Sequence, residues 1–247
     1  MIRIALFSDV HGNLTALDAV LADIDRQSVD EIIFAGDLCL AGARPAACVD
    51  RLRRRHIRGV YGNTEVWLLG RRPEEMTAPE SLQELITWTR EQLTSADKQW
   101  LGSLPFSLSF NPTPDPAGGL QIVHANPVDV MQVLYPPEVV QAAQPEGLRQ
   151  TDAAAQQLVT GVAAAILAFG HLHYPSLRAL NGLLLANISS VSLPADGDSR
   201  AKYAICQWDA DNGWQIAHQL VEYDLAAEKA MLAQIQPPNW EYLADSL

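Results

Sequence analysis

Short apolar runs alternate with helically spaced apolar residues along the first part of the chain. Residues 2–7 form a mostly β-prone run that predicts a strand, and residues 14–24 carry leucine, valine and isoleucine at helical spacing. A second run at 32–35 precedes a predicted helix over 45–55, and a third strand is predicted over 57–61. The order strand, helix, strand, helix, strand predicts a parallel, doubly wound start.

The later part of the chain predicts further helices and more strands. Residues 71–104 carry glutamates among apolar residues, which indicates amphipathic helices that form either a lid over the site or ordinary packing. The proline- and glycine-rich stretch 111–119 reads as a hairpin tip between strands at 106–110 and 120–123. Beyond residue 176, runs separated by turn dipeptides predict a second sheet built largely from hairpins.

Polar side chains stand where five of the apolar runs stop. They are Asp9 and His11, Asp37, Asn63, His124, and the pair His171 and His173. In an open α/β sheet, sites are assembled at this edge, so five loops can converge on one point. Carboxylate, amide and imidazole groups together can hold two divalent metal ions side by side, and this mixed set suits Mn²⁺, Fe, Zn²⁺, Co²⁺ or Ni²⁺ rather than Ca²⁺. The pattern predicts a metal-dependent hydrolase.

Each of these segments taken alone has an ordinary structural explanation. Asp9 resembles a loop residue or cap near a helix start, and Gly36-Asp37 and Gly62-Asn63 are common turn dipeptides. The metal-site hypothesis therefore rests on the combination: four of the six histidines and two aspartates stand at strand ends in one order.

Composition and charge narrow the class of partner. The 247 residues are 48% hydrophobic and 19% charged, which suits one large α/β domain with a proper core. The formal net charge of -12 argues against stable binding of duplex nucleic acid and favours a small anionic substrate at a locally positive metal site. The oligomeric state stays open, and a homo-oligomer is compatible with the sequence.

The cysteines and the apolar runs indicate the cellular setting. The three cysteines are widely spaced without a Cys-x-x-Cys pair, which favours neither a disulfide framework nor a thiolate zinc site. No apolar run is long enough for a signal-peptide core or a membrane span. We therefore expect a cytoplasmic protein.

Over nearly its whole length the chain resembles the calcineurin-like metallophosphoesterases. The segments 8–14 and 36–38 resemble the small bacterial and archaeal phosphoesterase branch in particular. The resemblance implies an α/β fold, a four-layer α/β/β/α sandwich of two mixed sheets, with residues 1–247 as a single domain. It also implies a dinuclear centre in which Asp9, His11 and His173 hold one ion, Asn63, His124 and His171 hold the other, and Asp37 bridges them.

The same resemblance implies the mechanism, with one departure. A hydroxide that bridges the two ions would attack phosphorus, with Asp37 and Asn63 in the catalytic centre. Many members follow Gly-Asn with a histidine that contacts the phosphate or protonates the leaving group, whereas this chain has Thr64 and then Glu65. Glu65 is a candidate stand-in, and substrates with good leaving groups are favoured over alkyl esters. Asn63 and Asn126 are candidate substrate contacts.

These observations lead to a ranked set of functions. The first hypothesis is hydrolysis of a small phosphomonoester or phosphodiester, with a nucleotide among the candidates, by two divalent metal ions of which Mn²⁺ is the first choice. A nuclease acting on single-stranded nucleic acid is the second, and a non-catalytic metal-binding scaffold is the third. The residues Leu38-Cys39-Leu40 after Gly-Asp differ from the pattern of the protein phosphatases, which disfavours phosphoprotein substrates.

Overall fold

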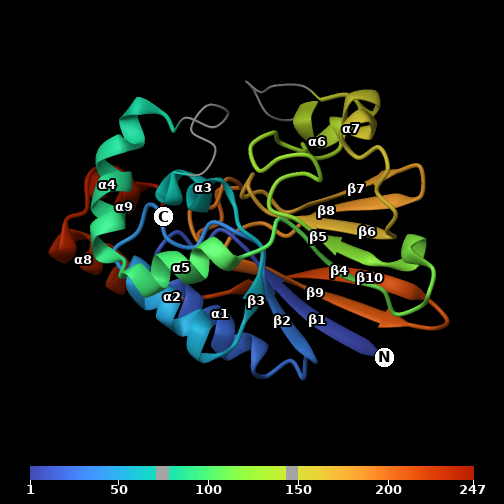
Figure 1. Ribbon diagram of the computed structural model, residues 1–247, viewed down its shortest axis with the longest axis horizontal. Coiled ribbons are helices and arrows are strands. Elements are labelled where there is room, and N and C mark those ends of the chain that lie inside the picture. The colour runs from blue at the N-terminus through green and yellow to red at the C-terminus, as the bar shows by residue number, and fades with distance from the viewer. Residues whose placement is uncertain (71–77, 143–149) are drawn as a thin grey trace.

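Two five-stranded sheets pack face to face in the computed structural model, which describes residues 1–70, 78–142 and 150–247 (Figure 1). The first sheet has the order β10 (Gly213–Val221), β9 (Ala201–Asp209), β1 (Ile2–Phe7), β2 (Glu31–Phe34) and β3 (Arg58–Gly59). The second has the order β4 (Leu108–Phe110), β5 (Leu120–Ile122), β6 (Ile166–Phe169), β8 (Leu183–Asn187) and β7 (Ser176–Leu180). Both are mixed: β1, β2 and β3 are parallel, as are β5, β6 and β8, and the remaining pairings are antiparallel.

Helices cover the outer faces of both sheets. On the first sheet lie α1 (Leu14–Ile24) and α2 (Pro45–Arg54), and around these two helices pack α4 (Gln83–Gln92), α5 (Ser95–Ser103), α8 (Leu225–Ile235) and α9 (Trp240–Asp245) (Figure 1). Near the second sheet lie α6 (Glu138–Ala142) and α7 (Asp152–Leu158). The short α3 (Asn63–Leu69) follows β3, and the single turns η1 (Glu80–Leu82) and η2 (Pro116–Gly118) complete the described elements. The predicted four-layer sandwich of two mixed sheets is confirmed.

Strand β1 lies in the middle of the first sheet and is buried on both faces. Its side chains alternate, so that Ile4 and Leu6 pack between the two sheets, whereas Ala5 and Phe7 pack against the helices. This double burial explains why the segment is a continuous apolar run instead of an alternating one. The strand therefore holds the loop that follows it, which carries Asp9, in a fixed place.

Strands β1, β2 and β3 are parallel as predicted, but the helices between them do not cover both faces of the sheet, so this part of the chain is not doubly wound. Helices α1 and α2 pack on the same face of the first sheet, because the other face is covered by the second sheet. Strand β3 is also shorter than the predicted strand over 57–61, and its ladder comprises only Arg58 and Gly59.

The later hairpins form as predicted but join two different sheets. The hairpin of β7 and β8 turns at Asn181-Gly182 and extends the second sheet, whereas that of β9 and β10 turns at 211–213 and extends the first. Asp196-Gly197 lies in the loop between β8 and β9. The prediction of one separate sheet after residue 176 was therefore wrong, because each hairpin adds to a sheet started earlier in the chain.

The predicted helical segment 71–104 is helical where it is described. It contains η1, α4 and α5, and its apolar side chains, such as Leu85 and Ile86, join the core between the helices and the first sheet. Residues 71–77 lie outside the described residues. In the described part of the chain, no helix has the length and apolar character needed to span a bilayer.

Candidate metal centre

Six of the seven candidate metal ligands lie in loops that follow strands of both sheets, and the seventh, Asn63, is the first residue of α3. Five of the seven have a left-handed backbone. These five are Asp9 (φ 55°), His11 (φ 51°), Asp37 (φ 64°), His171 (φ 67°) and His173 (φ 57°). Non-glycine residues rarely adopt this conformation, and when they do they cluster at functional sites where the surrounding structure holds them. Here backbone hydrogen bonds hold the loops together, with Asp9 N donating to Gly36 O at 2.9 Å and His11 N to Asp37 O at 3.1 Å.

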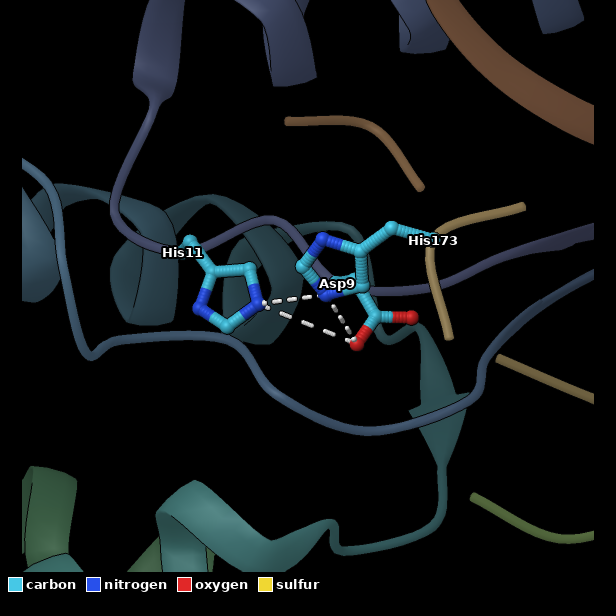
Figure 2. Close-up of side chains that lie close together, drawn as sticks. All are labelled: Asp9, His11 and His173. Atoms are coloured by element: carbon cyan, nitrogen blue, oxygen red, sulfur yellow. Dashed lines mark hydrogen bonds and ion pairs between the residues drawn. The ribbon is translucent and has the colours of Figure 1, made fainter. Parts of the chain in front are cut away.

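Asp9, His11 and His173 converge on one point (Figure 2). One ligand atom of each lies within 4.8 Å of the others. Asp9 Oδ1 is 3.2 Å from His173 Nε2 and 3.8 Å from His11 Nε2, and the two Nε2 atoms are 3.1 Å apart. Three ligand atoms from two distant loops thus surround a space of the size that one metal ion occupies.

The tautomers of the two histidines follow from their backbone partners. His11 Nδ1 lies 2.8 Å from the carbonyl oxygen of Leu40, and His173 Nδ1 lies 2.6 Å from that of Leu193. Because a carbonyl can only accept, each Nδ1 carries a hydrogen, which leaves Nε2 of each ring as the nitrogen that faces the other ring. Two lone pairs at 3.1 Å repel unless a cation lies between them. The arrangement therefore selects a positive charge at this point.

The charges around the pair support the same conclusion. Asp9 is fully buried, and its Oδ1 atom has no hydrogen-bond partner. Burial lowers the pKa of His11, but the carboxylates of Asp9 and Asp37 outweigh burial and raise it overall. Burial likewise raises the pKa of Asp9, but the neighbouring histidines bring it well below its ordinary value. An unpartnered buried carboxylate oxygen beside two histidine nitrogens fits a divalent metal ion.

A second group of candidate ligands lies beside the first. Ligand atoms of Asp9, Asp37 and His124 again lie within 4.8 Å of one another. His124 Nδ1 donates to Ala35 O at 2.9 Å, so its Nε2 lone pair points toward Asn63 Oδ1, 2.9 Å away, and Asp37 Oδ1, 3.4 Å away. Burial is the largest influence on His124 and lowers its pKa, which keeps the ring neutral and able to bind a metal ion.

Asp37 lies between the two groups. Its Oδ1 atom faces His124 at 3.4 Å, whereas its Oδ2 atom faces His11 Nε2 at 3.9 Å. One carboxylate thus directs its two oxygens toward two different histidines. This geometry supports the bridging position expected from the sequence.

His171 lies beside His124 of the second group. Its Nε2 donates to the carbonyl oxygen of Met131 at 2.9 Å, so Nδ1 is the atom that is free to bind a metal ion. Its ring centroid lies 5.1 Å from that of His124, and its backbone N–H donates to Asp9 Oδ2 at 2.9 Å. Burial lowers the pKa of His171, which again favours a neutral ring.

Two of the glycines in the motifs are required by close approach. A Cβ atom on Gly62 would collide with the Asp37 carboxylate and would lie 2.9 Å from the His124 ring. A Cβ atom on Gly170 would collide with Asp9 Oδ2 and with the Ser8 hydroxyl. Glycine therefore precedes the ligand in these loops because the strand ends approach the site too closely for a side chain.

Glu65 directs both of its carboxylate oxygens to backbone amides. Its Oε1 accepts from Leu38 N at 2.9 Å, and its Oε2 accepts from Asp37 N at 2.9 Å and Gly62 N at 2.8 Å. Burial, followed by the charge of Asp37, raises its pKa, while the backbone amides oppose that rise. Both oxygens are thus occupied, and the side chain is only 1% exposed. The geometry supports a positioning role in place of the catalytic role considered from the sequence.

Thr64 occupies the position where the resemblance leads one to expect a histidine. Its backbone N–H and its hydroxyl each donate to Asp37 Oδ1 at 3.0 Å. The residue therefore fixes the carboxylate that lies between the two groups. A threonine hydroxyl does not supply the readily transferred proton that a histidine would.

Asn126 is not directed toward the two groups of candidate ligands. Its Oδ1 accepts from the backbone of Val128 and Asp129, and its Nδ2 donates to Asp129 and to the carbonyl of Gln132. The residue is fully buried, so the structure gives it a loop-organising place and not the substrate contact considered from the sequence. The loop it organises carries Met131, which holds His171.

Four backbone carbonyls could not be identified as part of the site from the sequence. Those of Leu40, Ala35, Met131 and Leu193 each orient one histidine. Such groups fix the tautomer and direction of a metal-binding imidazole. They leave no signal in the side-chain pattern, because every residue has a carbonyl.

Comparison with known proteins shows which family the chain belongs to. Residues 2–211 match the calcineurin-like phosphoesterase superfamily domain. The chain belongs to this family. The family is metal-dependent and acts on phosphate esters, so its general chemistry is that of a phosphoric ester hydrolase.

Relatives in bacteria and archaea share the whole length of the chain. A metallophosphoesterase from Sphaerobacter thermophilus has 26% identity, a TM-score of 0.71, and coverage of 100% of this chain and 99% of its own. An uncharacterized protein from Methanocaldococcus jannaschii is 27% identical over 263 residues, covering 96% of this chain and 94% of its own. A hypothetical protein from Pyrococcus horikoshii shares the fold with a TM-score of 0.80 at 16% identity, covering 99% of this chain and 97% of its own.

Proposed function

We propose that this protein hydrolyses a small phosphomonoester or phosphodiester with two divalent metal ions, Mn²⁺ being the first choice. The observation that carries the proposal is the pair of facing Nε2 atoms, His11 and His173, beside the unpartnered Asp9 Oδ1. In a chain of a phosphoesterase family, such an arrangement is best explained by a metal ion that takes part in hydrolysis.

Seven residues would hold the ions. Asp9, His11 and His173 would hold one, Asn63, His124 and His171 the other, and Asp37 would bridge them. When bound, the ions would supply Lewis acidity toward phosphoryl oxygens and lower the pKa of a coordinated water. Mixed carboxylate, amide and imidazole ligands suit a first-row transition metal.

The chain itself would supply positioning. Glu65 and Thr64 hold Asp37 in its left-handed conformation, and the backbone carbonyls of Leu40 and Leu193 keep the two Nε2 lone pairs directed at one point. Such pre-organisation places charge-stabilising groups before the substrate arrives, so no reorganisation is required during the reaction.

The absence of a histidine at Thr64 bears on the substrate. The Thr64 hydroxyl is engaged with Asp37 Oδ1, and Glu65 has both oxygens occupied by backbone amides. Neither group is placed to protonate a leaving alkoxide. We therefore expect aryl and other activated esters to react faster than simple alkyl esters.

The test is turnover of two activated esters. Protein freed of metal and then given Mn²⁺ is assayed with p-nitrophenyl phosphate and with its bis-ester, and the ratio of the two rates distinguishes monoester from diester chemistry. The proposal expects turnover that a chelator abolishes and Mn²⁺ restores. Bound metal without turnover of either ester would instead favour a binding role.

A further inference from the structure

Asn187 is the last residue of β8 and is fully buried, although its side chain is polar. Both ends of its amide are hydrogen-bonded: Nδ2 donates to the carbonyl oxygen of Gly170 at 2.7 Å, and Oδ1 accepts from Ser189 N at 2.8 Å. Gly170 begins the loop 170–173, which carries His171 and His173, whereas Ser189 lies in the loop 188–195 that follows β8. One side chain therefore joins these two loops.

The loop 170–173 is held closely against Asp9 and His124. Gly170 N donates to the His124 carbonyl at 2.8 Å, and His171 N donates to Asp9 Oδ2 at 2.9 Å. The Gly170 carbonyl is the group that accepts from Asn187. Because even a Cβ atom on Gly170 would collide with Asp9 Oδ2, a displacement of Gly170 would disturb the arrangement of these ligands.

The loop 188–195 is bonded to two candidate ligands of the first group. Ser192 N donates to the carbonyl of Asp9 at 3.0 Å. His173 Nδ1 donates to the Leu193 carbonyl at 2.6 Å, and Ala195 N donates to the His173 carbonyl at 3.1 Å. The position of this loop therefore affects how Asp9 and His173 lie relative to one another.

An asparagine at the end of a strand has an ordinary explanation in the turn that follows. In an Asx turn the side-chain oxygen accepts from the N–H two residues on, and Asn187 makes this bond with Ser189. The turn requires only an oxygen, which aspartate and serine also supply. It does not explain the buried Nδ2 that donates to Gly170, where an aspartate would place an oxygen against the carbonyl. The amide nitrogen therefore has a role beyond the turn.

We propose that Asn187 is a positioning residue that sets His171 and His173 against Asp9 and thereby raises the affinity of the site for metal ions. This inference rests on the metal centre of the proposed function. Both ends of the amide are occupied, so Asn187 acts through the two loops and not as a ligand. Ligands held in place before binding lose less conformational freedom when the ion binds. Because the two histidines are assigned to different ions, both metal positions depend on Asn187.

The test removes the amide nitrogen and keeps the turn. In Asn187→Asp one oxygen can still accept from Ser189 N, while the other faces the Gly170 carbonyl and is repelled by it. Asn187→Ser also keeps an oxygen for the turn but buries no charge, so it serves as the second variant if the aspartate prevents folding. Calorimetric titration of Mn²⁺ into metal-free protein should show about tenfold weaker binding at both metal positions in each variant.

Leu185→Ala is the matched control for a loss of stability alone. Leu185 lies two residues earlier on β8 and is buried in the apolar core between the second sheet and α7. Its truncation should lower the melting temperature of the metal-free protein by about 5–15 °C and leave Mn²⁺ affinity unchanged. A purely structural role for Asn187 predicts native Mn²⁺ affinity in all three variants, and that result would overturn the proposal. An equal loss of affinity in Leu185→Ala would also overturn it, because affinity would then follow stability.

The two proposals fail in different ways. A native protein that binds two ions and hydrolyses p-nitrophenyl phosphate, with variants at Asn187 that bind Mn²⁺ equally well, keeps the proposed function and loses the positioning role. A native protein that binds two ions, loses affinity in the Asn187 variants and turns over no ester keeps the positioning role and loses the hydrolase function. A native protein that binds no Mn²⁺ loses both.

Discussion

The substitution Glu65→Gln separates a positioning role for this residue from a catalytic one. Glutamine has nearly the same volume as glutamate, but it has one acceptor oxygen and an NH₂ group in place of two acceptor oxygens. In the native protein three backbone N–H groups, from Gly62, Asp37 and Leu38, point at the carboxylate. In either orientation of the amide, at least one backbone donor will face another donor.

The magnitude follows from these contacts. A hydrogen bond to a charged group contributes about 1.5–3 kcal/mol, and a neutral one about 0.5–1.5 kcal/mol. The free-energy cost of losing one hydrogen bond and weakening two exceeds the free energy gained by no longer burying a charge. That gain is present because burial disfavours the charged form of Glu65. We expect the free energy of unfolding to fall by about 2–4 kcal/mol. Because Asp37 loses part of its support, we also expect Mn²⁺ affinity to fall about 10- to 100-fold.

The assay is calorimetric titration of Mn²⁺ into metal-free protein, together with thermal unfolding. Glu84→Gln, at an exposed position on α4, is the matched control and should leave both quantities unchanged. A Glu65→Gln variant with native metal affinity would refute the positioning role. If that variant also lost turnover, the result would favour Glu65 as the catalytic stand-in.

Three further predictions test the site from other directions. Asp37→Asn should weaken both metal positions and abolish turnover, and a variant that keeps two bound ions and full activity would rule out a bridging carboxylate. Removing metal with a chelator should lower the melting temperature by about 5–10 °C, relative to protein in free Mn²⁺ at 100 times its dissociation constant. Scanning calorimetry measures this difference, and an unchanged temperature would show that the folded state binds no metal. Gly170→Ala should impair metal binding because its Cβ would displace Asp9, whereas Gly118→Ala, with only an ordinary 3.7 Å contact to Thr113, should not; similar metal affinities in the two variants would contradict the close-approach argument.

The elements that could be predicted from the sequence are those with strong local patterns. Strand β1 and helix α1 agree with their predicted ranges, because a doubly buried apolar run and a helical repeat with the Asn13 cap act over a few residues. The partner of a strand is a long-range property. No local pattern between residues 176 and 221 indicates that the hairpin of β7 and β8 extends the second sheet, or that the hairpin of β9 and β10 pairs with β1.

The candidate site also has one part that could be predicted from the sequence and one part that could not. The loops that carry Asp9, Asp37 and His173 could be identified because each polar group ends an apolar run. The roles of Glu65 and Asn126 could not be predicted. The sequence does not distinguish a side chain that binds backbone amides from one that contacts the substrate or donates a proton. Burial and hydrogen-bond partners distinguish them, and those depend on the assembled fold.

The central claim is that the lone pairs of His11 and His173 and the oxygen of Asp9 face a metal ion. The most direct measurement is anomalous X-ray diffraction from crystals grown with Mn²⁺. The account predicts one anomalous peak among these three side chains and a second about 3.5–4 Å away, beyond Asp37. Crystals grown with Mn²⁺ that show no peak among Asp9, His11 and His173 would contradict it.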